Sequence, residues 1–146
     1  MAQTDLDDFD DFGEAARLVL FYARVAVSES GGVAITPDHL LLGILRGTPD
    51  VVTRFLLPSD SVDILAQEVL ATMGTTARPH ESAEIPISPE AVHVLAEALG
   101  RARATTARTV RPEHILLALM ETSHTKAVGV LRIRGITEET VAAYLR

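Results

Sequence analysis

Apolar residues recur at three- and four-residue intervals from Glu14 to Ser30, a stretch that contains neither proline nor glycine. This period predicts an amphipathic helix, and Gly31-Gly32 ends it. Polar caps, prolines at first helical positions and further apolar stripes predict seven more helices, which begin at about residues 36, 49, 59, 88, 112, 124 and 137. No stretch alternates apolar and polar residues in the manner of a strand, so we expect an all-α fold.

The pattern occurs twice. Residues 12–70 align without a gap on residues 87–145 at an offset of 75 positions, and most of the matched positions are apolar or begin helices. The repetition therefore concerns packing first. We predict two tandem pseudo-symmetric four-helix repeats, about eight helices in total, within one domain at 12–146. In this scheme a flexible acidic arm occupies 1–11, repeat one 12–73, a linker 74–86 and repeat two 87–146.

The composition narrows the class of protein. A chain of 146 residues with 47% hydrophobic content can bury a sizeable core but is short for two independent domains. Its apolar runs fall short of the roughly 18 residues that span a bilayer, and its first residues are acidic where a targeting peptide would be basic. We therefore expect a cytoplasmic protein without a membrane partner. The net charge of −7 argues against binding to nucleic acid.

The sequence offers little catalytic chemistry. It has no cysteine, no phosphate-binding Gly-x-x-x-x-Gly-Lys-Ser/Thr loop, no Gly-x-Ser-x-Gly elbow and no zinc-ligand spacing. We therefore expect a non-enzymatic protein that needs no cofactor or metal. His39 and His114 occupy equivalent positions in the two repeats, and we expect both to be buried and hydrogen-bonded instead of metal-bound.

Two matching segments carry a resemblance to a known family. Thr36-Pro37-Asp38-His39-Leu40-Leu41-Leu42-Gly43-Ile44-Leu45 and Arg111-Pro112-Glu113-His114-Ile115-Leu116-Leu117-Ala118-Leu119-Met120 stand at the repeat offset. This pattern resembles the N-terminal domain of the bacterial Clp ATPases, the protein-unfolding chaperones, and is most similar to their ClpC branch. The resemblance runs from about Phe12 to Arg146. Since no ATPase module follows in this sequence, it implies a stand-alone Clp N-domain.

The resemblance also implies candidate ligand-binding residues. In ClpC-like relatives each repeat can present a pocket for phosphoarginine, in which a hydroxyl residue at the start of the first helix supports the phosphate and the acid before the histidine pairs with the guanidinium. Repeat two keeps both elements as Ser88 and Glu113, whereas repeat one has Gly13 and Asp38. We therefore predict that a surviving site is the second one. Glu90, at a position that is commonly basic in the family, weakens the case for phosphate. The alternative role of these residues is to cap helices and to place charge in their first turns.

A second predicted surface is apolar. By resemblance, Phe9, Phe12 and Ile87 border the region where ClpC-type domains are engaged by peptide-like ligands, including macrocyclic antibiotics. Arg101, Arg103, Arg108 and Arg111 cluster near the end of the fifth predicted helix. This basic cluster could receive an acidic adaptor or the chain's own acidic arm.

These observations lead to three hypotheses. The first is a protein- and peptide-binding module that modulates a Clp chaperone–protease system as an adaptor, competitor or decoy, with protein segments, Clp adaptors or Clp substrates as partners. The second is a protein that sequesters peptide-like small molecules or antibiotics. The third is the excised substrate-receiving N-domain of a larger Clp ATPase.

Overall fold

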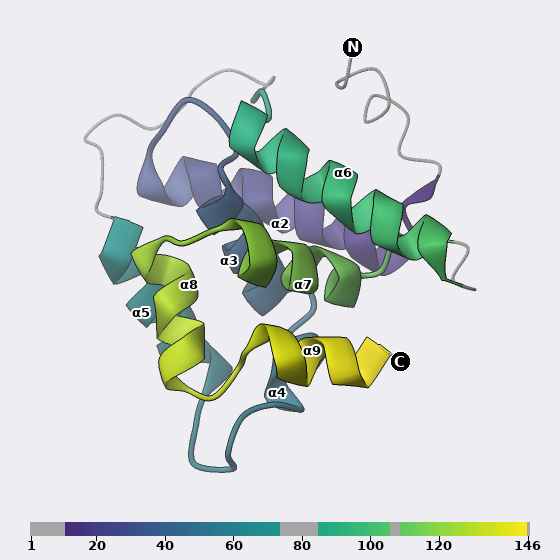
Figure 1. The fold of residues 1–146 in the computed structure, drawn as a ribbon. Helices are drawn as coiled ribbons and strands as arrows, with labels where there is room; N and C mark the ends of the chain where they lie inside the picture. Colours follow the sequence, from purple (N-terminus) through teal and green to yellow (C-terminus); the bar gives the residue numbers. More distant parts are fainter. Residues whose placement is uncertain (1–10, 74–84, 106–108, 146) are drawn as a thin grey trace.

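The computed structural model describes residues 11–73, 85–105 and 109–145. Within these residues the chain forms eight helices and no strand of a sheet, which confirms the all-α prediction (Figure 1). The helices are α2 (Glu14–Ser30), α3 (Pro37–Gly47), α4 (Asp50–Thr53), α5 (Val62–Met73), α6 (Pro89–Ala104), α7 (Pro112–Thr122), α8 (Lys126–Ile133) and α9 (Glu138–Leu145). None of them is both long and apolar enough to cross a bilayer. Phe9, most of the predicted arm and most of the predicted linker lie outside the described residues.

Capping side chains begin three of these helices, and two of them, Thr36 and Ser88, were predicted from the sequence. Thr36 accepts a hydrogen bond from the His39 backbone N–H before α3, Ser88 does the same for Ala91 before α6, and Thr125 for Val128 before α8. The sequence predicts a short third helix from Pro49-Asp50 through Leu57, and this length is wrong because α4 ends at Thr53. Pro58 follows Leu57, and a residue before proline is disfavoured in the α conformation.

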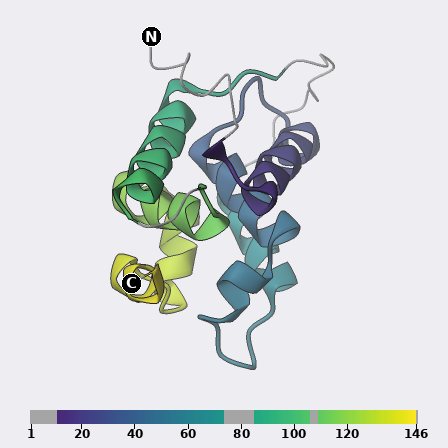
Figure 2. The same ribbon diagram turned by 90° about the vertical axis from the view of Figure 1, so that its right-hand side faces the viewer.

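The two repeats lie side by side, with repeat one in purple to teal and repeat two in green to yellow (Figure 2). In each repeat the first long helix packs against the acid–histidine helix, α2 against α3 and α6 against α7. Between the repeats, α3 contacts α7 and α5 contacts α8. The leucine-rich runs of α3 and α7 are buried nearly all round, as expected for enclosed helices, and contribute Leu40, Leu41, Leu42, Ile44, Ile115, Leu116 and Leu119 to the core.

Two short backbone pairings connect the repeats. Phe12 forms an isolated parallel bridge with Val110, and Ile35 forms another with Ile87. Since Phe12 and Ile87 differ by 75 positions, as do Ile35 and Val110, the pseudo-twofold relation exchanges the two bridges. The segment that leads into the first helix of one repeat therefore lies beside the segment that leads into the acid–histidine helix of the other repeat.

Candidate functional site

The bridges decide which candidate residues come together. The Ser88 backbone N–H donates to the Ile35 carbonyl oxygen at 2.9 Å, three residues before Asp38. The Gly13 N–H donates to the Val110 carbonyl oxygen at 3.0 Å, three residues before Glu113. The structure thus associates Ser88 with the start of α3 and Gly13 with the start of α7.

This arrangement corrects the pairing of Ser88 with Glu113 within one repeat. The start of α7 lies near the end of α6, because His114 lines a cavity with Arg101 and Ala104. Ser88 stands at the other end of α6, a helix of 16 residues and hence about 24 Å long. Sequence equivalence alone could not reveal that the repeats exchange these segments.

A cavity of about 560 Å³ lies where the starts of α3 and α6 meet the connection between α7 and α8. We call it the α3–α6 cavity. Pro37 and Pro89, the neighbours of Asp38 and Ser88, both line it. Further lining residues are Thr36, Glu90, His93, Val94, Thr122, Ser123, His124 and Thr125. The cavity therefore draws its lining from both repeats and from the starts of three helices.

Asp38 does not itself line this cavity, but it directly follows the lining residue Pro37, which places its carboxylate at the cavity edge. Its Oδ1 accepts a hydrogen bond of 2.7 Å from the hydroxyl of Thr125, a lining residue. Burial raises the pKa of Asp38, and the hydrogen bond from Thr125 opposes that rise. A partly desolvated carboxylate gains more from a cationic partner than an exposed one does, so the site suits an ammonium or guanidinium group.

The rest of the cavity is not strongly suited to phosphate. Glu90 lines it from the first turn of α6, where the helix dipole favours an acid. The Ser88 hydroxyl is largely buried, and its oxygen accepts a hydrogen bond from the Ala91 N–H at 3.1 Å. Ser88 therefore caps α6, which is the alternative to ligand binding at this position.

The Glu113 site differs from the Asp38 site. Glu113 is only 3% exposed, and its Oε2 lies 3.1 Å from Arg111 Nη2 and 3.6 Å from Arg54 Nη1. The guanidinium carbon of Arg54 lies 4.1 Å from the centre of the Tyr144 ring. The sequence pattern indicated Glu113 but neither Arg54, which directly follows α4 and approaches Glu113, nor Tyr144 of α9, whose ring lies against the Arg54 guanidinium. One available signal was the break in the repeat at Arg54, whose equivalent is Gly129.

Both acid-adjacent histidines are buried and hydrogen-bonded, as predicted. The Nδ1 atoms of His39 and His114 accept hydrogen bonds from the backbone N–H groups of Thr36 and Arg111, at 3.0 and 2.9 Å. The Nε2–H of His39 then donates to the Ser30 hydroxyl oxygen at 3.0 Å. Burial lowers the pKa of His39 to about 4 and also lowers that of His114. Among the described residues, no group of three or more metal-binding side chains is suitably placed for an ion.

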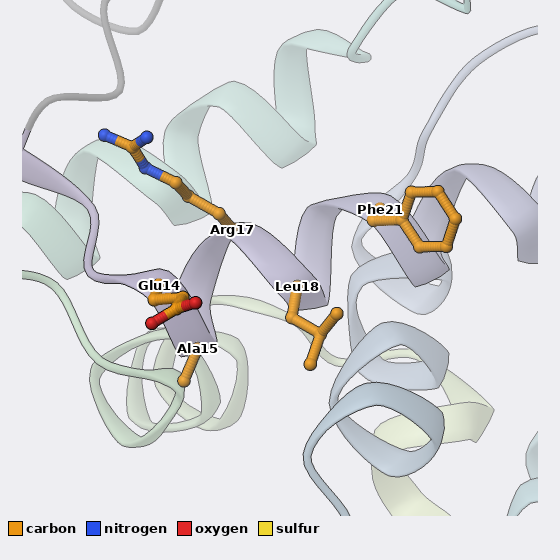
Figure 3. Close-up of a pocket in the computed structure, with 5 residues that line it drawn as sticks. All are labelled: Glu14, Ala15, Arg17, Leu18 and Phe21. Atoms are coloured by element: carbon orange, nitrogen blue, oxygen red, sulfur yellow. The ribbon is translucent and has the colours of Figure 1, made fainter.

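The predicted apolar surface of Phe9, Phe12 and Ile87 differs from the exposed apolar side chains that the structure shows. Phe12 is 2% exposed and belongs to the core, so its ring does not line a surface groove as we expected. Ile87 is half-buried against the same core. Exposed apolar side chains lie instead on α2, where Leu18 and Phe21 are 42% and 56% exposed. With Glu14, Ala15 and Arg17 they line an open hollow of about 590 Å³. Figure 3 shows these five side chains along α2.

The predicted basic cluster is largely paired within the chain. Arg103 Nη2 donates to Asp11 Oδ2 at 2.7 Å, so the last residue of the predicted acidic arm contacts this cluster. Arg101 pairs with Glu121, and Arg111 with Glu113. Arg108 lies outside the described residues.

Two four-helix repeats with exchanged backbone bridges, each built on a buried acid–histidine helix, define a class of protein. This is the all-α fold of the Clp-type N-terminal domains. The chain belongs to the family described as the Clp repeat (R) N-terminal domain, whose sequence profile matches residues 11–133.

Curated proteins of two mycobacteria are similar to the chain. It is 33% identical over 115 residues to uncharacterized proteins of Mycobacterium bovis and Mycobacterium tuberculosis. The match covers 77% of this chain and 44% of those proteins, so the chain spans less than half of their length.

Solved structures share the fold at lower identity. The N-terminal domain of ClpD from Arabidopsis thaliana matches with a TM-score of 0.71 and 20% identity, over 93% of this chain and 95% of that one. The N-domain of ClpV from Vibrio cholerae matches with a TM-score of 0.73 and 19% identity, over 99% and 87%. The Hsp104 N-terminal domain from Candida albicans matches with a TM-score of 0.69 and 20% identity, over 92% and 88%.

Proposed function

We propose that this domain binds basic segments of other proteins at the α3–α6 cavity and thereby modulates a Clp chaperone–protease system as an adaptor, competitor or decoy. The observation that carries the proposal is the partly buried Asp38 carboxylate at the edge of a cavity that both repeats build. Membership of the Clp repeat family supports protein segments as the partners.

The ligand chemistry follows from the charges around the cavity. Asp38 can pair with the guanidinium of an arginine side chain in a bidentate manner. Phosphoarginine is the modified form of this ligand, and the N-terminal end of α6 would then face its phosphate. Because Glu90 opposes that phosphate, we expect unmodified arginine peptides to bind at least as tightly as phosphorylated ones.

Calorimetric titration with matched short peptides tests this proposal. The peptides contain arginine, phosphoarginine or citrulline, the uncharged analogue of arginine. We expect saturable binding of the arginine peptide, no binding of the citrulline peptide, and at least a tenfold loss of affinity in Asp38→Asn. Glu113→Gln is the matched control at the equivalent position and should retain binding at the cavity. Absence of binding, or equal binding by Asp38→Asn and the wild type, would refute the assignment.

The exposed apolar face of α2 favours a second candidate function, sequestration of peptide-like small molecules. Leu18 and Phe21 could cover the apolar side of a cyclic peptide, since an exposed aromatic residue offers a large contact area at little entropic cost. Fluorescence titration with a hydrophobic cyclic peptide tests it. Phe21→Ala should abolish binding, whereas Leu57→Ala, a change at another exposed apolar residue, should not.

We keep as a third proposal that the chain is the substrate-receiving N-domain of a larger Clp ATPase. Sequencing of the reading frame beyond the codon for Arg146 tests it, because an ATPase module would begin with a recognisable phosphate-binding loop further along.

A further inference from the structure

The Glu113 carboxylate already holds guanidinium groups of its own chain. Its side chain is 4% exposed and is approached by Arg111 at 3.1 Å and by Arg54 at 3.6 Å. The Arg54 side chain is 31% exposed, and the Arg111 side chain is 53% exposed. Two charged side chains, themselves in contact with solvent, thus lie around a buried carboxylate.

Arg54 is held in this position by three contacts. Besides the ion pair with Glu113, its Nε–H donates to the Asp50 carbonyl oxygen at 3.2 Å. Its guanidinium group lies over the Tyr144 ring, and Phe55 packs edge-on against the same ring with centroids 6.1 Å apart. A carboxylate on one side and an aromatic face on another are the partners that an incoming guanidinium would itself use.

The Asp38 site lacks these arginines. At the repeat offset, Arg54 corresponds to Gly129 and Arg111 corresponds to Thr36. A Cβ atom added at Gly129 would meet no other atom within 4 Å. Within the described part of the chain, the side-chain partner of Asp38 is Thr125. Among the described residues, Glu113 therefore has arginine partners, whereas Asp38 has a hydroxyl.

The Glu113 site is also tight on the side of α2. A Cβ atom at Gly13 would lie 3.2 Å from the hydroxyl oxygen of Thr109 and 3.3 Å from the Val110 carbonyl oxygen. A side chain at position 13 would therefore require the segment before α7 to move by a few tenths of an ångström.

We propose that Arg54 is a built-in occupant of the Glu113 site, which closes that site to guanidinium ligands and leaves Asp38 as the acid that can receive them. This inference rests on the proposed guanidinium chemistry of the two acids. It makes Arg54 the residue that determines which of two equivalent sites can take a ligand.

Thermal unfolding with methylguanidinium as the probe tests the proposal, with methylammonium as the matched cation. All variants carry Asp38→Asn, so that the α3–α6 cavity does not contribute. We expect methylguanidinium to raise the Tm of Arg54→Gly saturably, by about 3 to 6 °C at ten times its dissociation constant. The same ligand should leave the Asp38→Asn parent unchanged, and Glu113→Gln added to Arg54→Gly should abolish the effect.

The proposal is overturned if Arg54→Gly responds no more than its parent, or if its response survives Glu113→Gln. Arg54→Ala is the second variant in case the glycine unsettles the end of α4. Folding of either variant only with methylguanidinium would support the proposal. Failure of both to fold in any condition would make Arg54 an inseparable structural partner of Glu113, and would also overturn it.

The reciprocal change closes the other site. Gly129→Arg places an arginine one helical turn after Thr125, where an added Cβ atom meets no other atom within 4 Å. We expect at least a tenfold loss of arginine-peptide binding, with Gly129→Ala as the matched control that retains it. Wild-type affinity in Gly129→Arg would contradict the equivalence of the two sites. If the wild type binds no peptide, the proposed function fails, whereas the Arg54 variants still decide this proposal.

Discussion

At Gly43 the backbones of α2 and α3 lie so close together that an added side chain has no space. A Cβ atom added there would lie 2.2 Å from the carbonyl oxygen of Val19 and 3.1 Å from the backbone nitrogen of Ala23. Real Cβ contacts essentially never fall below 3.0 Å, so Gly43→Ala must move α2 away by about 0.8 Å. Repeat two has Ala118 at the equivalent position, which shows that the demand belongs to repeat one and not to the family pattern.

The expected free energy is a difference of two effects. Alanine in place of glycine inside a helix gains about 1 kcal/mol from propensity. Separation of two packed helices costs about 3 kcal/mol, the upper part of the range for overpacked cores, because a backbone cannot rotate away as a side chain can. The net destabilisation is then about 2 kcal/mol, and for a domain of this size the Tm falls by about 4 to 8 °C.

Thermal and urea unfolding followed by circular dichroism measure this effect. Gly100→Ala is the matched control, because it lies in α6 and its added Cβ would meet no atom within 4 Å. It should stabilise the protein by about 0.5 to 1 kcal/mol. If Gly43→Ala were as stable as the wild type, or if both substitutions changed the Tm equally, the close approach of α2 and α3 at this position would be refuted.

Three further predictions concern the groups around the sites. Burial lowers the pKa of His39 from 6.5 to about 4, so between these pH values the unfolded chain binds more protons than the folded one. The free energy of unfolding is therefore full above pH 6.5 and falls by up to about 3 kcal/mol as the pH decreases to 4. Urea unfolding of His39→Gln should show a flatter pH profile. Ser88→Ala removes the cap of α6 and should cost about 1 kcal/mol in the same assay, whereas Ser88→Asp should retain the cap. Arg134 pairs with Asp60 and Glu68 across the repeats, so Arg134→Met should lower the stability by about 1 kcal/mol, and a double-mutant cycle with Glu68→Gln should recover a coupling that weakens at high salt.

Much of the fold could be predicted from the sequence, because helix starts depend on residues that are close together in the chain. Helix starts were predictable because Thr36, Ser88 and their following prolines satisfy and preorganise the first helical turn. Burial of His39 was predictable because its motif resembles one with a structural role in the family and has no metal-ligand spacing around it. These features depend on neighbours in the sequence, and neighbours are what a single sequence displays.

The parts that failed depend on contacts between distant segments. A repeat offset states that Ser88 corresponds to Gly13 and Glu113 to Asp38, but it does not state which helix start faces which acid. Phe12 is an aromatic residue and could contact a ligand, yet its backbone pairs with Val110 and its ring is buried in the core. Arg54 reaches Glu113 from a short helix whose order along the chain gives no hint of that contact.

The pseudo-symmetry itself explains how two equivalent acids can acquire different roles. A buried carboxylate at a helix start needs a partner, because an unpaired charge in that position is costly. Glu113 is almost fully buried and has two arginines, whereas Asp38 is less buried and has one hydroxyl. The ion pairs of Glu113 with Arg54 and Arg111 balance its charge without any other molecule. A cationic ligand would balance the charge of Asp38 better than the hydroxyl of Thr125 does. Under the proposed function, the same repeat thus supplies an internal ion pair at Glu113 and an acid that can bind a ligand at Asp38.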